Sequence, residues 1–245
     1  MNRFIFYLVS LLLVTGNAGA AGGGVHLEHA PVDVTNKPSL QRGAKFFVNY
    51  CQGCHSIKYS RYSRVGEDIG LTDIQVEDNL IFTDAKVRDQ IKTSMKPEES
   101  GKWFGSAPPD LSLVARAKGT DWLYTYLRSF YVDESRPLGV NNLVLENASM
   151  PHVLWELQGW QKAVYKEGTE NSSRPVIEHL ELAQPGQMTP EEYDRAMLDL
   201  VNFLTYVSEP AQLKRKQIGV WVLIFLVLLF AVSLLLKKDY WRDVH

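Results

Sequence analysis

Cys51-Gln52-Gly53-Cys54-His55 is the stretch of sequence that decides how this chain is interpreted. Its pattern, C-x-x-C-H, places two thiols three positions apart and an imidazole directly after the second. Two thiols at this spacing can add to the two vinyl groups of one haem, and the adjacent histidine then lies beneath the iron as its proximal ligand. We therefore predict one covalently attached haem c, bound through Cys51 and Cys54 and ligated by His55.

Two other uses of a C-x-x-C pair fit the rest of the sequence poorly. A structural zinc site needs about four ligands, and the chain has no second cysteine pair. The histidines outside the motif show no ligand spacing: His26, His29, His152, His179 and His245. A thioredoxin-like redox pair needs a βαβ context, and the sequence pattern does not indicate one. Haem attachment is the interpretation that remains.

The opposite axial position of the iron needs a second ligand, and four methionines or a histidine are candidates. Met197 falls in an apolar stripe of a predicted helix, Met188 lies just before a helix start, and Met95 lies in a charged segment. Met150 precedes Pro151, which holds its backbone extended, and a loop of this kind can carry a thioether across a haem face. The residues alone favour Met150 and leave the others open. A methionine ligand raises the reduction potential, which suits electron transfer.

Two apolar segments flank the predicted haem domain. Met1–Ala20 begins with a basic residue, runs apolar and ends in Ala-Gly-Ala, the pattern of a secretory signal peptide. Ile218–Leu236 carries no charge and, at about 1.5 Å per residue, is close to the 30 Å thickness of a bilayer core. We predict a signal peptide at 1–20, an exported haem domain at 21–213, a transmembrane anchor at 214–237 and a cytoplasmic tail at 238–245. The haem domain would then lie on the periplasmic side of a bacterial inner membrane.

Charge is distributed unevenly along the chain. Residues 21–213 contain 19 Lys and Arg against 26 Asp and Glu, a net charge of −7, whereas residues 214–245 carry a net charge of +4. An acidic body argues against nucleic acid as a partner. The acidic surface either confers solubility alone or also steers a basic partner.

Helical patterns dominate the exported domain, so a mainly α fold is expected. Ser39 is a candidate cap for a helix that runs to about Tyr50. Thr189 and Glu192 form a capping box, with proline between them at the first helical position, before a periodic apolar stripe. We find no β-hairpin signal. Residues 133–150 are interpreted as a long loop and residues 167–187 as polar surface.

Several short motifs together resemble one known family. They are Arg42-Gly43 before the haem motif, the run 51–59 (CQGCHSIKY), Ala107-Pro108-Pro109-Asp110-Leu111-Ser112, and Met150-Pro151. A single C-terminal membrane helix after an amphipathic helix completes the pattern. In this combination the chain resembles the cytochrome c1 family, the haem c subunit of the cytochrome bc1 complex. The resemblance implies a cytochrome c-like haem domain with one C-terminal transmembrane helix.

The same resemblance implies roles for individual residues. Met150 would be the sixth ligand of the iron, and the carbonyl of Pro109 would accept the Nδ1–H of His55. Arg116 lies where the family places a basic residue near a haem propionate, but Lys118 is an alternative. In addition, Gly43 and Phe47 would meet the helix that contains residues 193–204.

The implied function is a one-electron relay. A Rieske iron–sulfur protein would reduce the haem and a cytochrome c would remove the electron, within a homodimeric complex that also contains cytochrome b. No residue pattern indicates acid–base or nucleophilic catalysis, so the enzyme activity would belong to the complex. One alternative is a stand-alone anchored cytochrome that serves another periplasmic partner. Another is a haem enzyme or gas sensor with an open iron site, which would bind carbon monoxide readily.

Overall fold

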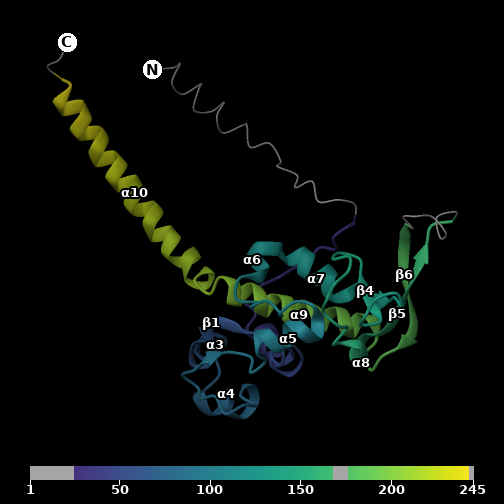
Figure 1. Ribbon diagram of the computed structural model, residues 1–245. Helices are drawn as coiled ribbons and strands as arrows, with labels where there is room; N and C mark the ends of the chain where they lie inside the picture. The colour runs from purple at the N-terminus through teal and green to yellow at the C-terminus, as the bar shows by residue number, and fades with distance from the viewer. Residues whose placement is uncertain (1–24, 168–175, 243–245) are drawn as a thin grey trace.

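The computed structural model describes residues 25–167 and 176–242 of the chain (Figure 1). The predicted signal peptide and residues 243–245 of the predicted tail lie outside the described residues. The mainly α fold is confirmed. The helices are α2 (Lys37–Phe46), the π-helical turn η1 (Phe47–Cys51), α3 (Tyr62–Ile69), α4 (Asp73–Leu80), α5 (Pro97–Phe104), α6 (Val114–Lys118), α7 (Thr120–Arg128), α8 (Trp155–Gln158), α9 (Pro190–Ser208) and α10 (Gln212–Tyr240). The strands are β1 (Ile57–Arg61), β2 (Gln90–Ile91), β3 (Phe130–Val132), β4 (Val140–Asn142), β5 (Gly159–Tyr165) and β6 (Ile177–Pro185).

Helices α2 and α9 cross in close contact at the centre of the domain. A Cβ atom at Gly43 would lie 2.1 Å from the carbonyl oxygen of Asp199, so only glycine allows this approach. Beside the crossing, the rings of Phe47 and Phe203 lie 5.8 Å apart and both are fully buried. Arg42 donates to the Asp199 carboxylate through Nε at 2.6 Å and through a terminal nitrogen at 2.9 Å. The contact of Gly43 and Phe47 with the last soluble helix is therefore confirmed.

Helix α7 also packs against α9, and polar contacts as well as apolar ones join these two helices. The buried hydroxyl of Tyr193 donates to the carbonyl of Leu127 at 2.9 Å. Arg128 pairs with Asp194 at 2.5 Å and also with Glu28, which ties the N-terminal segment to the two helices. Consequently α9 supports both α2 and α7.

Of the two helix starts predicted from the sequence, one is confirmed and the other is wrong. The capping box is confirmed: Thr189 Oγ1 accepts from the Glu192 amide at 3.3 Å, and the Glu192 carboxylate accepts from the Thr189 amide at 2.9 Å. Ser39 is not the cap of α2, because Asn36 holds that position and accepts from the Ser39 amide at 3.2 Å. Pro38 is compatible with a helix that begins at Lys37, because a residue in the first turn of a helix does not need to donate a backbone N–H within the helix. Ser39 is buried instead and donates to Asp199 at 2.6 Å.

The expectation that the chain has no β-hairpin is wrong. Each pair β1–β2, β3–β4 and β5–β6 is antiparallel within the described ranges. Strand β6 lies in the stretch interpreted as polar surface, and most of its residues are exposed on both faces. A strand with no buried face lacks the alternation of apolar and polar residues that marks strands in a sequence.

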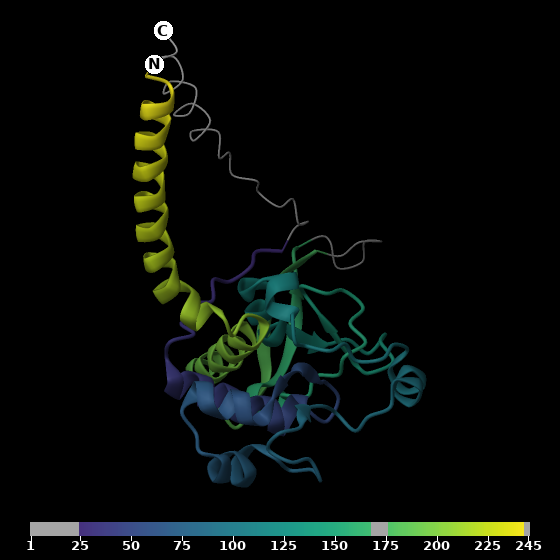
Figure 2. The ribbon, with the colours of Figure 1, turned by 90° about the vertical axis from the view of Figure 1, so that its left-hand side faces the viewer.

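Helix α10 projects away from the folded body (Figures 1 and 2). Among the described helices it is the one long and apolar enough to cross a membrane, over Ile218–Tyr240. The apolar side chains of this span are exposed, from Ile218 at 57% to Leu236 at 56%. Because α9 ends at Ser208, only three residues separate the soluble helix from α10.

Candidate cofactor site

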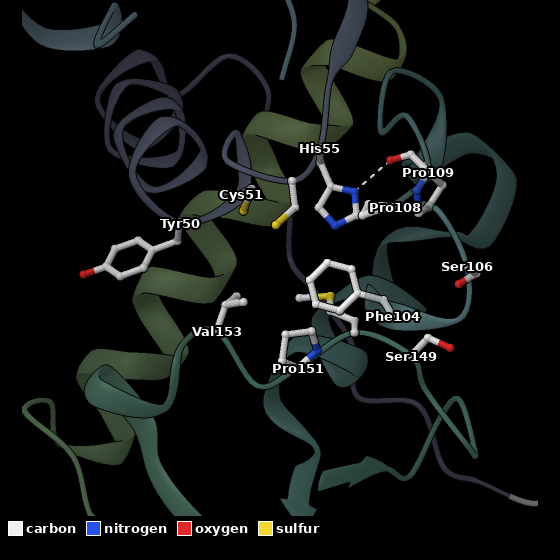
Figure 3. A pocket seen from close by; sticks show the side chains of 12 residues that line it. Tyr50, Cys51, His55, Phe104, Ser106, Pro108, Pro109, Ser149, Pro151 and Val153 are labelled. Atoms are coloured by element: carbon white, nitrogen blue, oxygen red, sulfur yellow. Dashed lines mark hydrogen bonds between the residues drawn. The ribbon is translucent and has the colours of Figure 1, made fainter. Parts of the chain in front are cut away.

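The C-x-x-C-H motif begins at the last residue of η1 and folds into a tight turn. The amides of Cys54 and His55 both donate to the carbonyl of Cys51, at 3.0 and 2.7 Å. This turn follows α2 without a break, so the α2–α9 crossing fixes where the motif begins. Figure 3 shows Cys51 and His55 projecting toward the same cavity.

The imidazole of His55 is fixed by a backbone carbonyl. Its Nδ1 lies 2.7 Å from the oxygen of Pro109, drawn as the dashed line in Figure 3. Because a carbonyl only accepts, Nδ1 carries the hydrogen and Nε2 has a free lone pair. Nε2 has no hydrogen-bond partner among the described residues. Burial lowers the pKa of His55, although the Pro109 bond and the charge of Asp110 act in the opposite direction.

The segment that carries the Pro109 carbonyl is itself held against the chain after the motif. The amide of Leu111 donates to the carbonyl of Ser56 at 2.8 Å, and Asp110 accepts from the Lys58 amide at 3.0 Å. Ser112 accepts from the Tyr59 amide at 3.1 Å. These bonds fix the acceptor of His55, so the orientation of the imidazole follows from backbone geometry.

The cavity beside His55 encloses about 520 Å³ including its open mouth. Its lining is mostly apolar and consists of Tyr50, Cys51, Cys54, His55, Phe104, Ser106, Pro108, Pro109, Ser149, Met150, Pro151 and Val153. Figure 3 shows Phe104, Pro151 and Val153 across the cavity from His55.

Met150 is the methionine that lines this cavity together with the motif. Its sulfur accepts from the hydroxyl of Tyr126 at 3.5 Å, a contact that sequence reasoning missed. Of the other methionines, Met197 is fully buried in the core. Met95 lines a neighbouring cavity that Cys54 also lines. The amide of Met188 donates to the carbonyl of Leu157.

Two adjacent asparagines shape the loop that leads to Met150, and sequence reasoning missed both. Asn142 donates from its amide to the carbonyl of Tyr126 at 2.8 Å and accepts from the Val144 amide at 2.9 Å. Asn141 accepts from the amide of Asn147, which adopts a positive φ of 63°. Asparagine tolerates this conformation and favours turns, so Asn-Asn at the end of a strand was the available signal.

The chemistry of the donor set fits a covalent haem. Cys51 and Cys54 are both free, and burial raises the pKa of Cys51 to about 12, so its thiol is neutral beside an apolar cavity. Nε2 of His55 and the thioether of Met150 are neutral donors of the kinds that ligate iron in c-type cytochromes. Together the apolar lining, two thiols, one imidazole and one thioether supply what such a group requires.

The basic residues predicted to meet a propionate lie apart from the cavity lining. Arg116 and Lys118 are both exposed on α6. The ammonium of Lys118 lies 5.3 Å from the ring centre of Trp122. The structure thus brings Cys51, Cys54, His55, Pro109 and Met150 together, whereas the proposed role of Arg116 stays a prediction.

Comparisons with known proteins agree on one family. The family model described as the Cytochrome C1 family matches residues 28–244. Cytochrome c1 of Allochromatium vinosum is 50% identical over 243 residues, which cover 99% of this chain and 100% of that protein. A protein of Nitrosomonas europaea named ammonia monooxygenase gamma subunit is 46% identical over 245 residues, 100% of both chains. A protein of Bradyrhizobium diazoefficiens named cytochrome b/c1 is 23% identical over 251 residues, 88% of this chain and 34% of that longer protein.

Proposed function

The chain belongs to the cytochrome c1 family, and from this premise we propose that it relays single electrons as a subunit of a quinol–cytochrome c oxidoreductase. The supporting observation is the convergence of Cys51, Cys54, His55 and Met150 on one apolar cavity. Membership of the family implies covalently bound haem c, which supplies the one-electron chemistry when bound. The residues of this chain attach it, ligate it and control access to it.

Each residue has a distinct role in this proposal. Cys51 and Cys54 would attach the group covalently through their thiols and limit its orientation. His55 would ligate through Nε2, because the Pro109 carbonyl at 2.7 Å keeps the hydrogen on Nδ1 and fixes the ring plane. The thioether of Met150 would be the second side-chain ligand, and by occupying that position it would exclude small-molecule ligands and favour Fe(II).

The cavity walls limit the approach of water to the reacting group. Phe104, Pro151 and Val153 stand across the cavity from His55 (Figure 3). An apolar environment disfavours the extra charge of the oxidised state and so raises the reduction potential. We propose Arg116, with Lys118 as the alternative, as the basic residue that meets a propionate.

The partners follow from the family and from its relatives. A relative whose name joins cytochrome b and c1 supports cytochrome b as a partner. We propose a Rieske iron–sulfur protein as the electron donor, a cytochrome c as the acceptor, and a homodimeric complex. The net charge of −7 over residues 21–213 suits a basic acceptor.

We propose that the chain is anchored in a bacterial inner membrane by one helix. The order of segments is a signal peptide (1–20), a periplasmic haem domain (21–213), the anchor (214–237) and a cytoplasmic tail (238–245). The supporting feature is α10, whose span Ile218–Tyr240 is uncharged up to Leu236. The signal-peptide pattern at the N-terminus supports this orientation.

Purification from native membranes in a mild detergent tests the assembly. We expect haem b and a Rieske centre to co-purify, and quinol to reduce the haem c. If the protein emerges alone and quinol does not reduce it, the stand-alone anchored cytochrome is the better interpretation. If an ammonia-oxidising enzyme co-purifies instead of cytochrome b, the chain is better assigned as a subunit of that enzyme, as the name of the Nitrosomonas relative states for that protein.

Substitution of Met150 by Leu tests the proposed sixth ligand. The variant should lose the absorption band of sulfur ligation, bind carbon monoxide readily when reduced, and have a lower midpoint potential. Met188→Leu is the matched control, because Met188 is similarly half-buried but does not line the cavity. An unchanged spectrum and potential in Met150→Leu would exclude Met150 as the ligand.

A further inference from the structure

The hydroxyl of Tyr126 is aimed at the sulfur of Met150 from the interior of the domain. The two atoms lie 3.5 Å apart, and the sulfur is the one hydrogen-bond partner of this hydroxyl among the described residues. Tyr126 lies in the second turn of α7 and is only 8% exposed. Water therefore has little access to compete for the hydroxyl.

Aromatic rings on two sides hold Tyr126 in place. The Trp122 ring stacks on it with centroids 4.9 Å apart and planes at 9°, and the Phe130 ring meets it edge-on at 5.1 Å. Trp122 comes one helical turn earlier on α7, and Phe130 starts β3 directly after that helix. These two ring contacts limit the movement of the Tyr126 ring, so they keep its hydroxyl directed at Met150.

The loop that carries Met150 is attached to the same group of rings. His152 stacks on Phe130 with centroids 5.1 Å apart and planes at 6°, and it meets Trp160 edge-on at 5.9 Å. Asn142 ties the strand before the loop to the carbonyl of Tyr126. Both the donor and the acceptor of the contact are therefore fixed to Phe130, so their separation is a property of the fold.

We propose that Tyr126 is a positioning residue that sets the reduction potential through Met150, a proposal that rests on Met150 being the axial ligand of the proposed function. A thioether sulfur has two lone pairs, so it can ligate iron with one and accept the tyrosine hydrogen with the other. Accepting that hydrogen makes the sulfur a poorer electron donor. Because Fe(III) gains more from donation than Fe(II), the hydrogen bond favours the reduced state and raises the potential.

The size of the effect is bounded by the strength of the contact. The net contribution of a neutral hydrogen bond corresponds to a factor of about 2 to 10 in an equilibrium constant. Only the difference between the two oxidation states counts, so this factor is an upper limit. At a fixed ambient potential, removal of the hydroxyl should lower the ratio of reduced to oxidised haem by up to that factor.

The test is a redox titration of full-length Tyr126→Phe in detergent, together with its ferric absorption spectrum. Phenylalanine keeps both ring contacts and removes only the hydroxyl, and the covalent haem content checks that the protein has folded. Tyr131→Phe is the matched control, because Tyr131 is 7% exposed on β3, whereas among the described residues the hydrogen bond to the Met150 sulfur comes from Tyr126. We expect a lower midpoint potential in Tyr126→Phe, a retained but shifted sulfur-ligation band, and no shift in the control.

The outcomes separate this inference from the ligand assignment. If Met150→Leu loses the sulfur band while Tyr126→Phe has the native potential, the role of Tyr126 is refuted and the ligand assignment stands. An equal shift in Tyr131→Phe, or a raised potential in Tyr126→Phe, also refutes it. If Met150→Leu leaves the spectrum and potential unchanged, the ligand assignment fails first and this inference fails with it.

Discussion

Replacing Gly43 by Ala tests whether the close crossing of α2 and α9, from which the haem motif follows, requires glycine. The new Cβ would lie 2.1 Å from the carbonyl oxygen of Asp199 and 2.6 Å from the Cβ of Phe203. Ordinary contacts of a Cβ begin near 3.4 Å. The obstacle is backbone, and it cannot be relieved by rotating a side chain, so the two helices have to separate.

The expected loss of stability follows from two opposing contributions. Overpacking of a core typically costs about 1–3 kcal/mol, and an obstacle made of backbone favours the upper end. Alanine is a better helix former than glycine by about 1 kcal/mol. The net destabilisation is therefore about 2 kcal/mol, which for a chain of this size lowers Tm by about 4–8 °C.

Thermal unfolding followed by circular dichroism in detergent measures this difference. Gly101→Ala is the matched control, because Gly101 lies inside α5 and a Cβ there has no atom within 4 Å. The control should be as stable as the native protein or up to about 1 kcal/mol more stable. If Gly43→Ala melts at the native temperature, the crossing tolerates a side chain and this reasoning is wrong.

Two further predictions concern α9. Thr189→Ala removes the hydroxyl of the capping box and should destabilise the protein by about 0.5–2 kcal/mol in urea unfolding; an unchanged midpoint would mean that the cap does not contribute. Tyr193→Phe loses the bond to the Leu127 carbonyl and should cost about 0.5–1.5 kcal/mol at pH 7. Burial raises the pKa of Tyr193 above that of the unfolded chain, so the stability from its protonated hydroxyl is present below about pH 10 and is lost as the pH rises further. The difference between native and Tyr193→Phe should therefore shrink above pH 10, and a difference that stays constant from pH 7 to 11 would contradict this assignment.

The parts of the fold that the sequence predicted well depend on neighbouring residues. The capping box of Thr189 and Glu192 spans one turn, and the apolar span that starts at Ile218 is continuous. The motif Cys51–His55 is also local, because five adjacent residues carry its chemistry. In each case the interacting groups lie within a few positions of one another, so a pattern in the sequence specifies them.

The parts that were missed depend on contacts between distant segments. The pairing of β5 with β6 joins Gly159 to Pro185 across a connection of many residues, and the exposed second strand leaves no alternation to detect. The contact of Tyr126 with Met150 joins an ordinary aromatic position on a helix to a loop. Nothing in the residues around Tyr126 distinguishes it from Tyr124 or Tyr131, because the hydroxyl gains its partner only when the loop folds back.

The two walls of the cavity are held by different helices, α2 and α7, and both of these helices pack against α9. On one side, Cys51 and His55 follow α2, which touches α9 at Gly43. On the other side, Met150 contacts Tyr126 of α7, which is joined to α9 through the Tyr193–Leu127 bond. The separation of the two proposed axial ligands is therefore set by where two helices dock on a third. Because only three residues separate the end of α9 from the start of α10, the helix that spaces the ligands is also the one that connects to the proposed membrane anchor, so the connection between the site and the anchor is short.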